Sequence, residues 1–80
     1  MITSGQIKAA RALLGMTAST LAEISEVAYT TVVRMESSDG VPSGQVKTLD
    51  AVQRALEKAG IEFIGSPESG AGVRWKPKSQ

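Results

Sequence analysis

The side chains best suited to recognise a ligand lie in one short stretch, EVAYTTVVRMES, which runs from residue 26 to residue 37. The guanidinium of Arg34 can donate two parallel hydrogen bonds to a planar pair of acceptors. Thr30 offers a hydroxyl and a methyl, Tyr29 offers a hydroxyl and a ring, and Ala28 offers a methyl. The chemistry of this stretch is therefore recognition by hydrogen bonds and apolar contact.

The composition argues against catalysis. The chain has no Cys and no His, which excludes disulfides, thiol catalysis and the usual zinc sites. Proton transfer at neutral pH would fall on a carboxylate or a lysine with a shifted pKa, because the usual residue is missing. We therefore expect no enzyme, no metal and no cofactor. A formal net charge of +1 is only a weak hint of nucleic acid, so the distribution of charge has to decide.

The length and the hydropathy pattern bound the class of protein. Eighty residues make one domain near the lower limit for a single apolar core. Aromatic residues are scarce, so the core has to come from aliphatic side chains, which favours small helices packed closely. No apolar run approaches the roughly 18 residues of a membrane span, and the N-terminus lacks the layout of a signal peptide. We expect a cytoplasmic protein with no membrane segment.

Apolar periodicity predicts four helices, over residues 4–14, 18–25, 28–36 and 46–59. Thr3 and Gln6 have the spacing of a capping box, Thr17 can cap the second helix, and Gly15 suits a left-handed helix end. Residues 28–33 have a composition typical of a strand, but their flanks indicate a helix. The inward positions that these spacings predict are Ile7, Ala10, Leu13 and Leu14, then Leu21, Ala22 and Ile24, then Val27, Val32 and Met35, then Val46, Leu49, Val52, Leu56 and Ala59.

Residues 61–77 change to an alternating period, which predicts two short strands, and residues 78–80 form a tail. An isolated two-stranded hairpin is marginal in water, so these strands pack on the last helix, pair with their twin in a second subunit, or do both. We expect them to contribute to a homodimer through Ile61, Phe63, Ile64, Val73 and Trp75. The predicted fold class is mainly α, with a compact four-helix domain over residues 1–60 and two short C-terminal β-strands.

From about Gln6 to Leu56 the chain resembles the Xre family, the small bacterial and phage helix-turn-helix proteins of the lambda repressor and Cro type. The likeness is carried by residues at the spacing of that family: Arg11, Leu14-Gly15-Met16-Thr17, Leu21-Ala22, Val27, Val32 and Arg34-Met35-Glu36. The resemblance implies a lambda-repressor-like fold whose third helix, over residues 28–36, is the recognition helix and enters the DNA major groove.

The resemblance also implies roles for individual residues. With Val32 and Met35 inward as in the family, the side chains that read bases are Ala28, Tyr29, Thr30 and Arg34. The phosphate contacts are expected from Thr17, Ser19, Thr31, Ser37 and Lys47. Arg11 and Glu36 are expected to form a structural ion pair between the first helix and the end of the recognition helix.

Two positions depart from the pattern of the family. Ala18 stands where the second helix commonly begins with Gln, so the phosphate contact of that Gln cannot be carried over. Glu26 stands where the turn usually has Gly, and a left-handed backbone there would cost roughly 1 kcal/mol.

Several residues have a second interpretation. Arg34 can be an ordinary solvated helix residue, and Tyr29 a half-buried packing residue. Val33 is apolar on a face expected to be open, where it can contact thymine methyls or a partner subunit. The basic run of Arg74, Lys76 and Lys78 can contact phosphates, but we favour a guard against aggregation at an exposed strand edge.

Together these inferences predict a sequence-specific DNA-binding transcriptional regulator. We expect a repressor that acts as a homodimer on a pseudo-palindromic operator of double-stranded DNA, with half-sites about one helical turn apart. The alternative is a protein-interaction module on the same fold, an antitoxin or an antiactivator, which Ala18 and the low net charge favour slightly.

Overall fold

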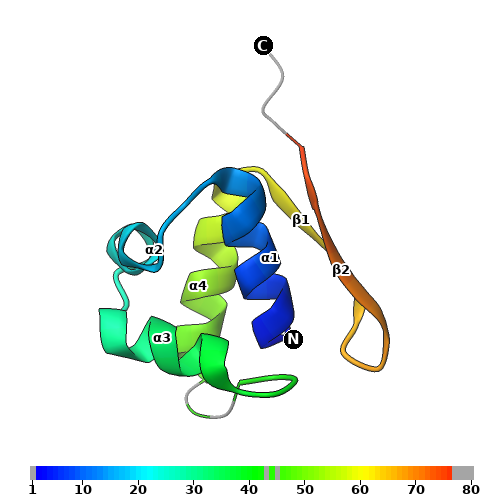
Figure 1. The fold of residues 1–80 in the computed structure, drawn as a ribbon, viewed down its shortest axis with the longest axis horizontal. Coiled ribbons are helices and arrows are strands. Elements are labelled where there is room, and N and C mark those ends of the chain that lie inside the picture. The colour runs from blue at the N-terminus through cyan, green and yellow to red at the C-terminus, as the bar shows by residue number, and fades with distance from the viewer. Residues whose placement is uncertain (1, 43, 45, 77–80) are drawn as a thin grey trace.

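The computed structural model describes residues 2–42, 44 and 46–76, and in this part of the chain four helices precede one β-hairpin (Figure 1). The elements are α1 (Ser4–Leu14), α2 (Ala18–Ser25), α3 (Tyr29–Ser37), α4 (Val46–Lys58), β1 (Ile61–Ser66) and β2 (Ser69–Trp75). The predicted mainly α fold with two C-terminal strands is confirmed, with helix ends shifted by one residue at most. The predicted tail at 78–80 lies outside the described residues. None of the described helices has the length and apolar character needed to cross a membrane.

Local chemistry sets the ends of the first two helices. Thr3 Oγ1 accepts a hydrogen bond from the Gln6 amide at 3.1 Å, and Gln6 Oε1 accepts one from the Thr3 amide at 2.8 Å, which completes the predicted capping box. α1 ends at Gly15, whose φ of 64° is left-handed as predicted. Thr17 caps α2, because its hydroxyl accepts a hydrogen bond from the Thr20 amide at 3.0 Å.

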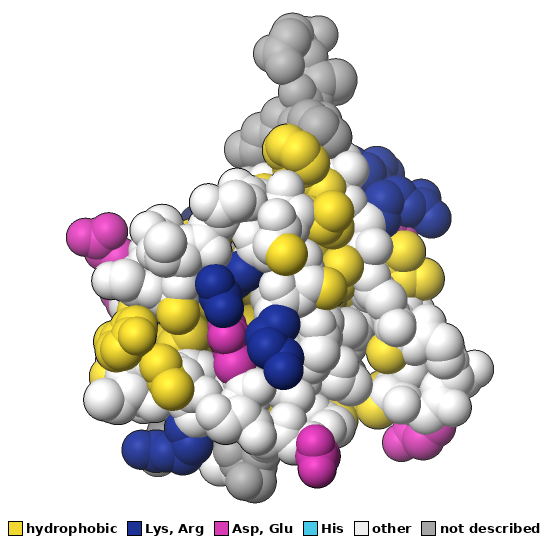
Figure 2. Space-filling view, in the orientation of Figure 1, with side chains coloured by type: hydrophobic (Ala, Val, Ile, Leu, Met, Phe, Trp, Pro, Cys, Tyr) yellow, Lys and Arg dark blue, Asp and Glu magenta, His cyan; other side chains and the backbone are white. Residues whose placement is uncertain are grey.

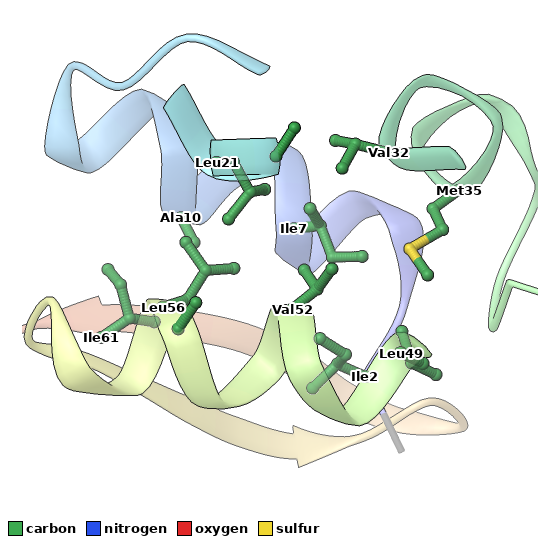
Figure 3. Close-up of a cluster of buried hydrophobic side chains, with 12 residues drawn as sticks. Ile2, Ile7, Ala10, Leu21, Val32, Met35, Leu49, Val52, Leu56 and Ile61 are labelled. Atoms are coloured by element: carbon green, nitrogen blue, oxygen red, sulfur yellow. The ribbon is translucent and has the colours of Figure 1, made fainter. Parts of the chain in front are cut away.

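The core lies where all four helices and β1 converge (Figure 3). Its fully buried large side chains come from different helices: Ile7, Leu21, Val32, Val52 and Leu56. In Figure 1, α1 and α4 lie side by side, α3 crosses below them, and α2 and the hairpin lie on opposite sides. Contacts between helices therefore hold α3 in place, since nine residues are too few for a stable isolated helix.

Three residues predicted to face inward lie at the surface instead. The exposed fractions are 44 % for Leu13, 46 % for Ile24 and 67 % for Val46. Leu13 and Ile24 lie in the last turns of their helices and Val46 begins α4. Near the end of a helix an apolar period can continue although fewer neighbouring residues are there to cover the side chain. The inward prediction is wrong at these three positions.

β1 and β2 pair antiparallel within one chain, with Ile61 opposite Trp75 and Phe63 opposite Val73. Opposite residues share a face of the sheet and successive residues alternate between faces. Those four side chains therefore lie on one face, and Ile64 lies on the other. The face that carries these four side chains packs against the helices, because Phe63 and Val73 contact the core and Ile61 is only 4 % exposed.

This register corrects the predicted dimer surface in one respect. Ile61 belongs to the core of its own chain, so its side chain is not available to a second subunit. The five residues named for the dimer do not form a single outer surface, since Ile64 points away from the others. Trp75, which is 44 % exposed at the end of β2, keeps the largest free apolar surface among them.

A buried amide joins the hairpin to α1. Gln6 is 4 % exposed, and its Nε2 donates hydrogen bonds to the carbonyl oxygens of Ile64 at 3.2 Å and Gly72 at 2.8 Å. One side chain thereby contacts both strands while it also caps its own helix. The sequence predicts only the capping role of Gln6. Its hydrogen bonds to the hairpin join residues 58 and 66 positions apart, and no local sequence pattern indicates such contacts.

Candidate nucleic-acid interface

α2 and α3 are joined by only three residues, 26–28. Glu26 has a left-handed backbone, with φ 59° and ψ 37°, and the amide of Val27 donates to the Ala22 carbonyl at 3.0 Å. The left-handed backbone of Glu26 and this hydrogen bond end α2 and change the direction of the chain. Leu21 of α2 and Val32 of α3 are both fully buried, so apolar packing on each side of the turn fixes the two helices against the core.

Glu26→Gly is expected to stabilise the fold by about 0.5–1 kcal/mol. The left-handed conformation costs a residue with a Cβ about 1–2 kcal/mol, and part of that gain is lost to the greater freedom of glycine in the unfolded chain. Thermal unfolding should shift upward by about 2–8 °C for a domain of this size.

Gly15→Ala is the matched control, because Gly15 ends α1 with φ 64° and an added Cβ would meet no atom within 4 Å. This variant should lose stability by a similar amount through backbone strain alone. A Glu26→Gly protein that is no more stable than the wild type would contradict the account of the turn.

α3 presents a continuous exposed stripe to solvent. Thr30, Val33, Arg34 and Ser37 are all exposed, and their spacings of three, four and seven residues place them on one side of a helix. The opposite side holds the buried residues Val32 and Met35. Val33, at 40 % exposed, lies within the stripe between polar neighbours, so a group that docks on α3 meets one guanidinium, hydroxyls and a branched apolar side chain.

The other predicted base readers lie at the start of α3. Ala28 is its N-cap and is exposed, and Tyr29 is 55 % exposed. Tyr29 precedes Val33 by four residues and Glu36 by seven, so it lies on the flank of α3 on which Glu36 lies. Thr31 is half-buried on the other flank. The structure therefore brings Thr30 and Arg34 together on the open side and places Tyr29 at its border.

The predicted phosphate ligands differ in how free their polar atoms are. Ser19 and Lys47 are exposed. The hydroxyl of Thr17 is engaged with Thr20, and Ser37 Oγ donates to the Val33 carbonyl at 2.8 Å. Ala28 makes no side-chain cap, which leaves the first amide groups of α3 for water or an anion.

The predicted ion pair between Arg11 and Glu36 is present and has two hydrogen bonds. Arg11 Nε and Nη2 donate to the two carboxylate oxygens at 2.6 and 2.7 Å, and Nη1 donates to the Met16 carbonyl at 2.9 Å. The hydrogen bond to Glu36 raises the pKa of Arg11 above its usual value against the effect of burial, and the nearby charge of Glu36 adds to it. This guanidinium is occupied in holding together α1, the connection between α1 and α2, and the end of α3.

The described Lys and Arg side chains lie in separate groups on the face shown in Figure 2, with no continuous basic patch there. Several are paired: Arg54 with Asp50 at 2.9 Å, and Arg74 and Lys76 with Glu62 at 3.5 and 3.8 Å. Lys78, the last residue of the predicted basic run, lies outside the described residues. Any attraction to an anionic partner therefore depends on a few cations, of which Arg34 lies on the exposed side of α3.

A scan of protein-family models gives no match to this chain, and a search of curated proteins gives none. Its function is therefore inferred from the residues and the geometry described above.

Proposed function

We propose that this chain is a DNA-binding transcriptional regulator of the Xre type, with α2 and α3 as its helix-turn-helix and α3 as the recognition helix. The observation that carries the proposal is the exposed stripe of Thr30, Val33, Arg34 and Ser37 on a short helix whose other side is anchored in the core. The regulator is proposed to act as a homodimer that represses by occupying a pseudo-palindromic operator.

The residue types on this stripe support binding better than they support folding. Threonine and valine are poorer helix formers than alanine or leucine because their branched Cβ restricts χ1. On the open side of α3 they remain exposed, and even Val33 is only partly covered, so burial offsets little of this cost. The helix is instead held from behind, by Val32, Met35 and the pair between Arg11 and Glu36. To read bases in a groove, a helix needs one side held rigidly by the protein and an exposed side with both polar and apolar groups.

Each side chain of the stripe has a matching group on duplex DNA. Arg34 suits O6 and N7 of a guanine, and Thr30 and Val33 suit the methyl of a thymine. Lys47, Ser19 and the free amide groups at the start of α3 suit the phosphates, which position the protein without reading sequence. We therefore propose a half-site that contains a guanine beside at least one thymine.

Arg34→Ala is expected to weaken binding to the preferred duplex by about 1–3 kcal/mol and to relax the preference at one base pair. The preferred site would first be selected from random duplexes, which also yields its symmetry and half-site spacing. Binding of both proteins to that site and to single-base variants would then be measured by fluorescence anisotropy. Arg54→Ala is the matched control, since it removes the same charge from an exposed pair on α4, and it should leave base preference unchanged. Operator affinity that is indifferent to Arg34→Ala would rule out the assigned reader.

Salt dependence separates DNA binding from association with another protein through apolar contact. Each phosphate neutralised by the protein contributes about −0.9 to the slope of log K against log salt. A dimer with roughly four such contacts should lose on the order of 10²-fold in affinity between 50 and 200 mM salt. Affinity that stays constant over this range would contradict the proposed mode of binding.

The second candidate is a protein-interaction module on the same fold. It is favoured by Ala18, which lacks the amide for a phosphate contact, by the low net charge and by the exposure of Tyr29 and Val33. For this candidate the selection from random duplexes returns no enriched sequence, and Val33→Asp weakens association with the protein partner more than Arg34→Ala does.

A further inference from the structure

The outer edge of β2 carries unpaired backbone groups. In the described residues the sheet has two strands, so each strand has one free edge. The Lys76 amide donates to the Gly60 carbonyl at 2.8 Å, toward the β1 side. Because backbone groups alternate in direction along a strand, Arg74 and Gly72 also point toward β1. The amide and carbonyl groups of Ala71, Val73 and Trp75 therefore point to the open edge.

The side chains along β2 change size halfway. Ser69, Gly70, Ala71 and Gly72 are small, and Val73, Arg74, Trp75 and Lys76 are large. No proline interrupts this stretch, and a Cβ added to Gly72 would meet no atom within 4 Å. The small side chains of residues 69–72 leave space on both faces of the strand. The large side chains of residues 73–76 in a neighbouring strand could fill that space.

We propose that β2 pairs antiparallel with β2 of a second copy of this chain, with Val73 opposite Val73. Ala71 of each chain then lies opposite Trp75 of the other, and these facing pairs exchange their outward backbone hydrogen bonds. The result is a four-stranded antiparallel sheet that removes one free edge from each chain, which is how exposed edges are blunted.

Size and charge both select the antiparallel arrangement. Each large side chain falls opposite a small one: Trp75 opposite Ala71, Arg74 opposite Gly72 and Lys76 opposite Gly70. Arg74 and Lys76 are therefore not directly opposite another cation, and Glu62 lies within 4 Å of both in its own chain, where its single negative charge offsets one of their two positive charges. A parallel pairing would set Arg74 beside Arg74 and Trp75 beside Trp75, and like charges directly opposite are destabilising.

α1 adds apolar surface beside the same edge. Gln6 contacts Gly72, and Leu13 lies seven residues further along on the same side of α1. α1 and β2 run in the same direction in Figure 1, so a rise of about 10 Å in each brings Leu13 level with Trp75. Leu13 and Trp75 are each 44 % exposed. A second copy at this edge would cover side chains that are half-open in the monomer.

This interface rests on the homodimer of the proposed function, but its formation requires no DNA. Dimerisation is therefore measured on the free protein by analytical ultracentrifugation over a micromolar concentration series. Failure of the edge pairing appears in these data, whereas failure of the proposed function appears in the selection of duplexes.

A charge introduced at position 72 tests the register of the pairing most directly, because Gly72 lies opposite Arg74 of the second copy. Gly72→Lys should raise the dissociation constant of the dimer about tenfold through two symmetric like-charge pairs, and Gly72→Glu should lower it or leave it unchanged. Within one chain Glu62 and Arg74 both lie on the same face beside position 72, so their opposite effects on a lysine or a glutamate there largely offset each other. Tighter dimerisation by Gly72→Lys than by Gly72→Glu would overturn the proposed register.

Ala71→Pro tests the backbone bonds. It removes an amide that points to the open edge, so the pairing with β1 is kept, and the protein should sediment as a monomer. Ala71→Ser keeps the amide and should remain dimeric. Trp75→Ala is less informative, because a Cβ on Gly60 would lie 3.3 Å from Cδ1 and Nε1 of Trp75, so the indole also packs within its own chain. A wild-type monomer throughout the series, or a dimeric and folded Ala71→Pro protein, would overturn the proposal.

Discussion

Arg11→Ala is expected to destabilise the fold by about 3–5 kcal/mol, because it breaks a largely buried ion pair. The Glu36 side chain is 10 % exposed and that of Arg11 is 23 % exposed. Loss of the guanidinium would leave a nearly buried carboxylate without its two donors and the Met16 carbonyl without its own. A domain of this size has a total stability of about 4–12 kcal/mol, so the variant should be largely unfolded at moderate denaturant concentrations.

The measurement is urea unfolding followed by circular dichroism, with Arg54→Ala as the matched control. Arg54 pairs with Asp50 at 2.9 Å, yet their side chains are 75 % and 51 % exposed. Removal of an exposed pair of this kind costs about 0–1 kcal/mol.

The double variant Arg11→Met with Glu36→Met should recover much of the loss, because no charge is then left unpaired. The same cost for Arg11→Ala and Arg54→Ala would show that the Arg11 pair does not lock the helices.

Gln6→Glu is expected to cost about 3 kcal/mol or more at neutral pH. The substitution keeps the shape of the side chain but replaces the Nε2 donor by a carboxylate oxygen. That oxygen would face the carbonyl oxygens of Ile64 and Gly72, now 3.2 and 2.8 Å from Nε2. Each buried carbonyl that loses its donor costs about 1–3 kcal/mol, and an uncompensated buried charge adds to this.

Two other variants separate the contributions to this loss. Gln6→Met removes the hydrogen bonds without adding a charge, so it should cost less than Gln6→Glu. Gly5→Glu adds a carboxylate to the same turn of α1 at an exposed position. It should stabilise α1 by a few tenths of a kcal/mol or more, through the helix dipole and the loss of a helical glycine. Urea unfolding in which Gln6→Glu is no more harmful than Gly5→Glu would contradict the role of Gln6 as the link to the hairpin.

Local signals in the sequence determined where α1 begins and ends and where α2 begins. Thr3 with Gln6 marks the start of α1, Gly15 marks its end, and Thr17 marks the start of α2, because these groups interact within a few residues. The resemblance to a family predicts the pair of Arg11 and Glu36, and the geometry of the pair agrees with that expectation. Hydrogen bonds across three or four residues are what the sequence determines by itself.

Tertiary structure alone decided which apolar side chains are covered. Periodicity indicates that Leu13, Ile24 and Val46 share a side with core residues, but the width of the covered strip depends on where neighbouring helices diverge. The same holds for the hairpin. Alternation predicts two strands, yet only packing on α1 and α4 shows that Ile61 belongs to the core and that Gln6 contacts both strands.

The stretch from Tyr29 to Ser37 shows both contributions. Its threonines and valines have strand-like preferences, and nine residues are too few to hold a helix in water. It is nevertheless helical, because Val32 and Met35 are buried in the core and Glu36 is bound by Arg11. The sequence determined the chemistry of its exposed side chains. Burial of its opposite side decided that they share one face, since apolar packing and a bound ion pair outweigh the local preference of the chain.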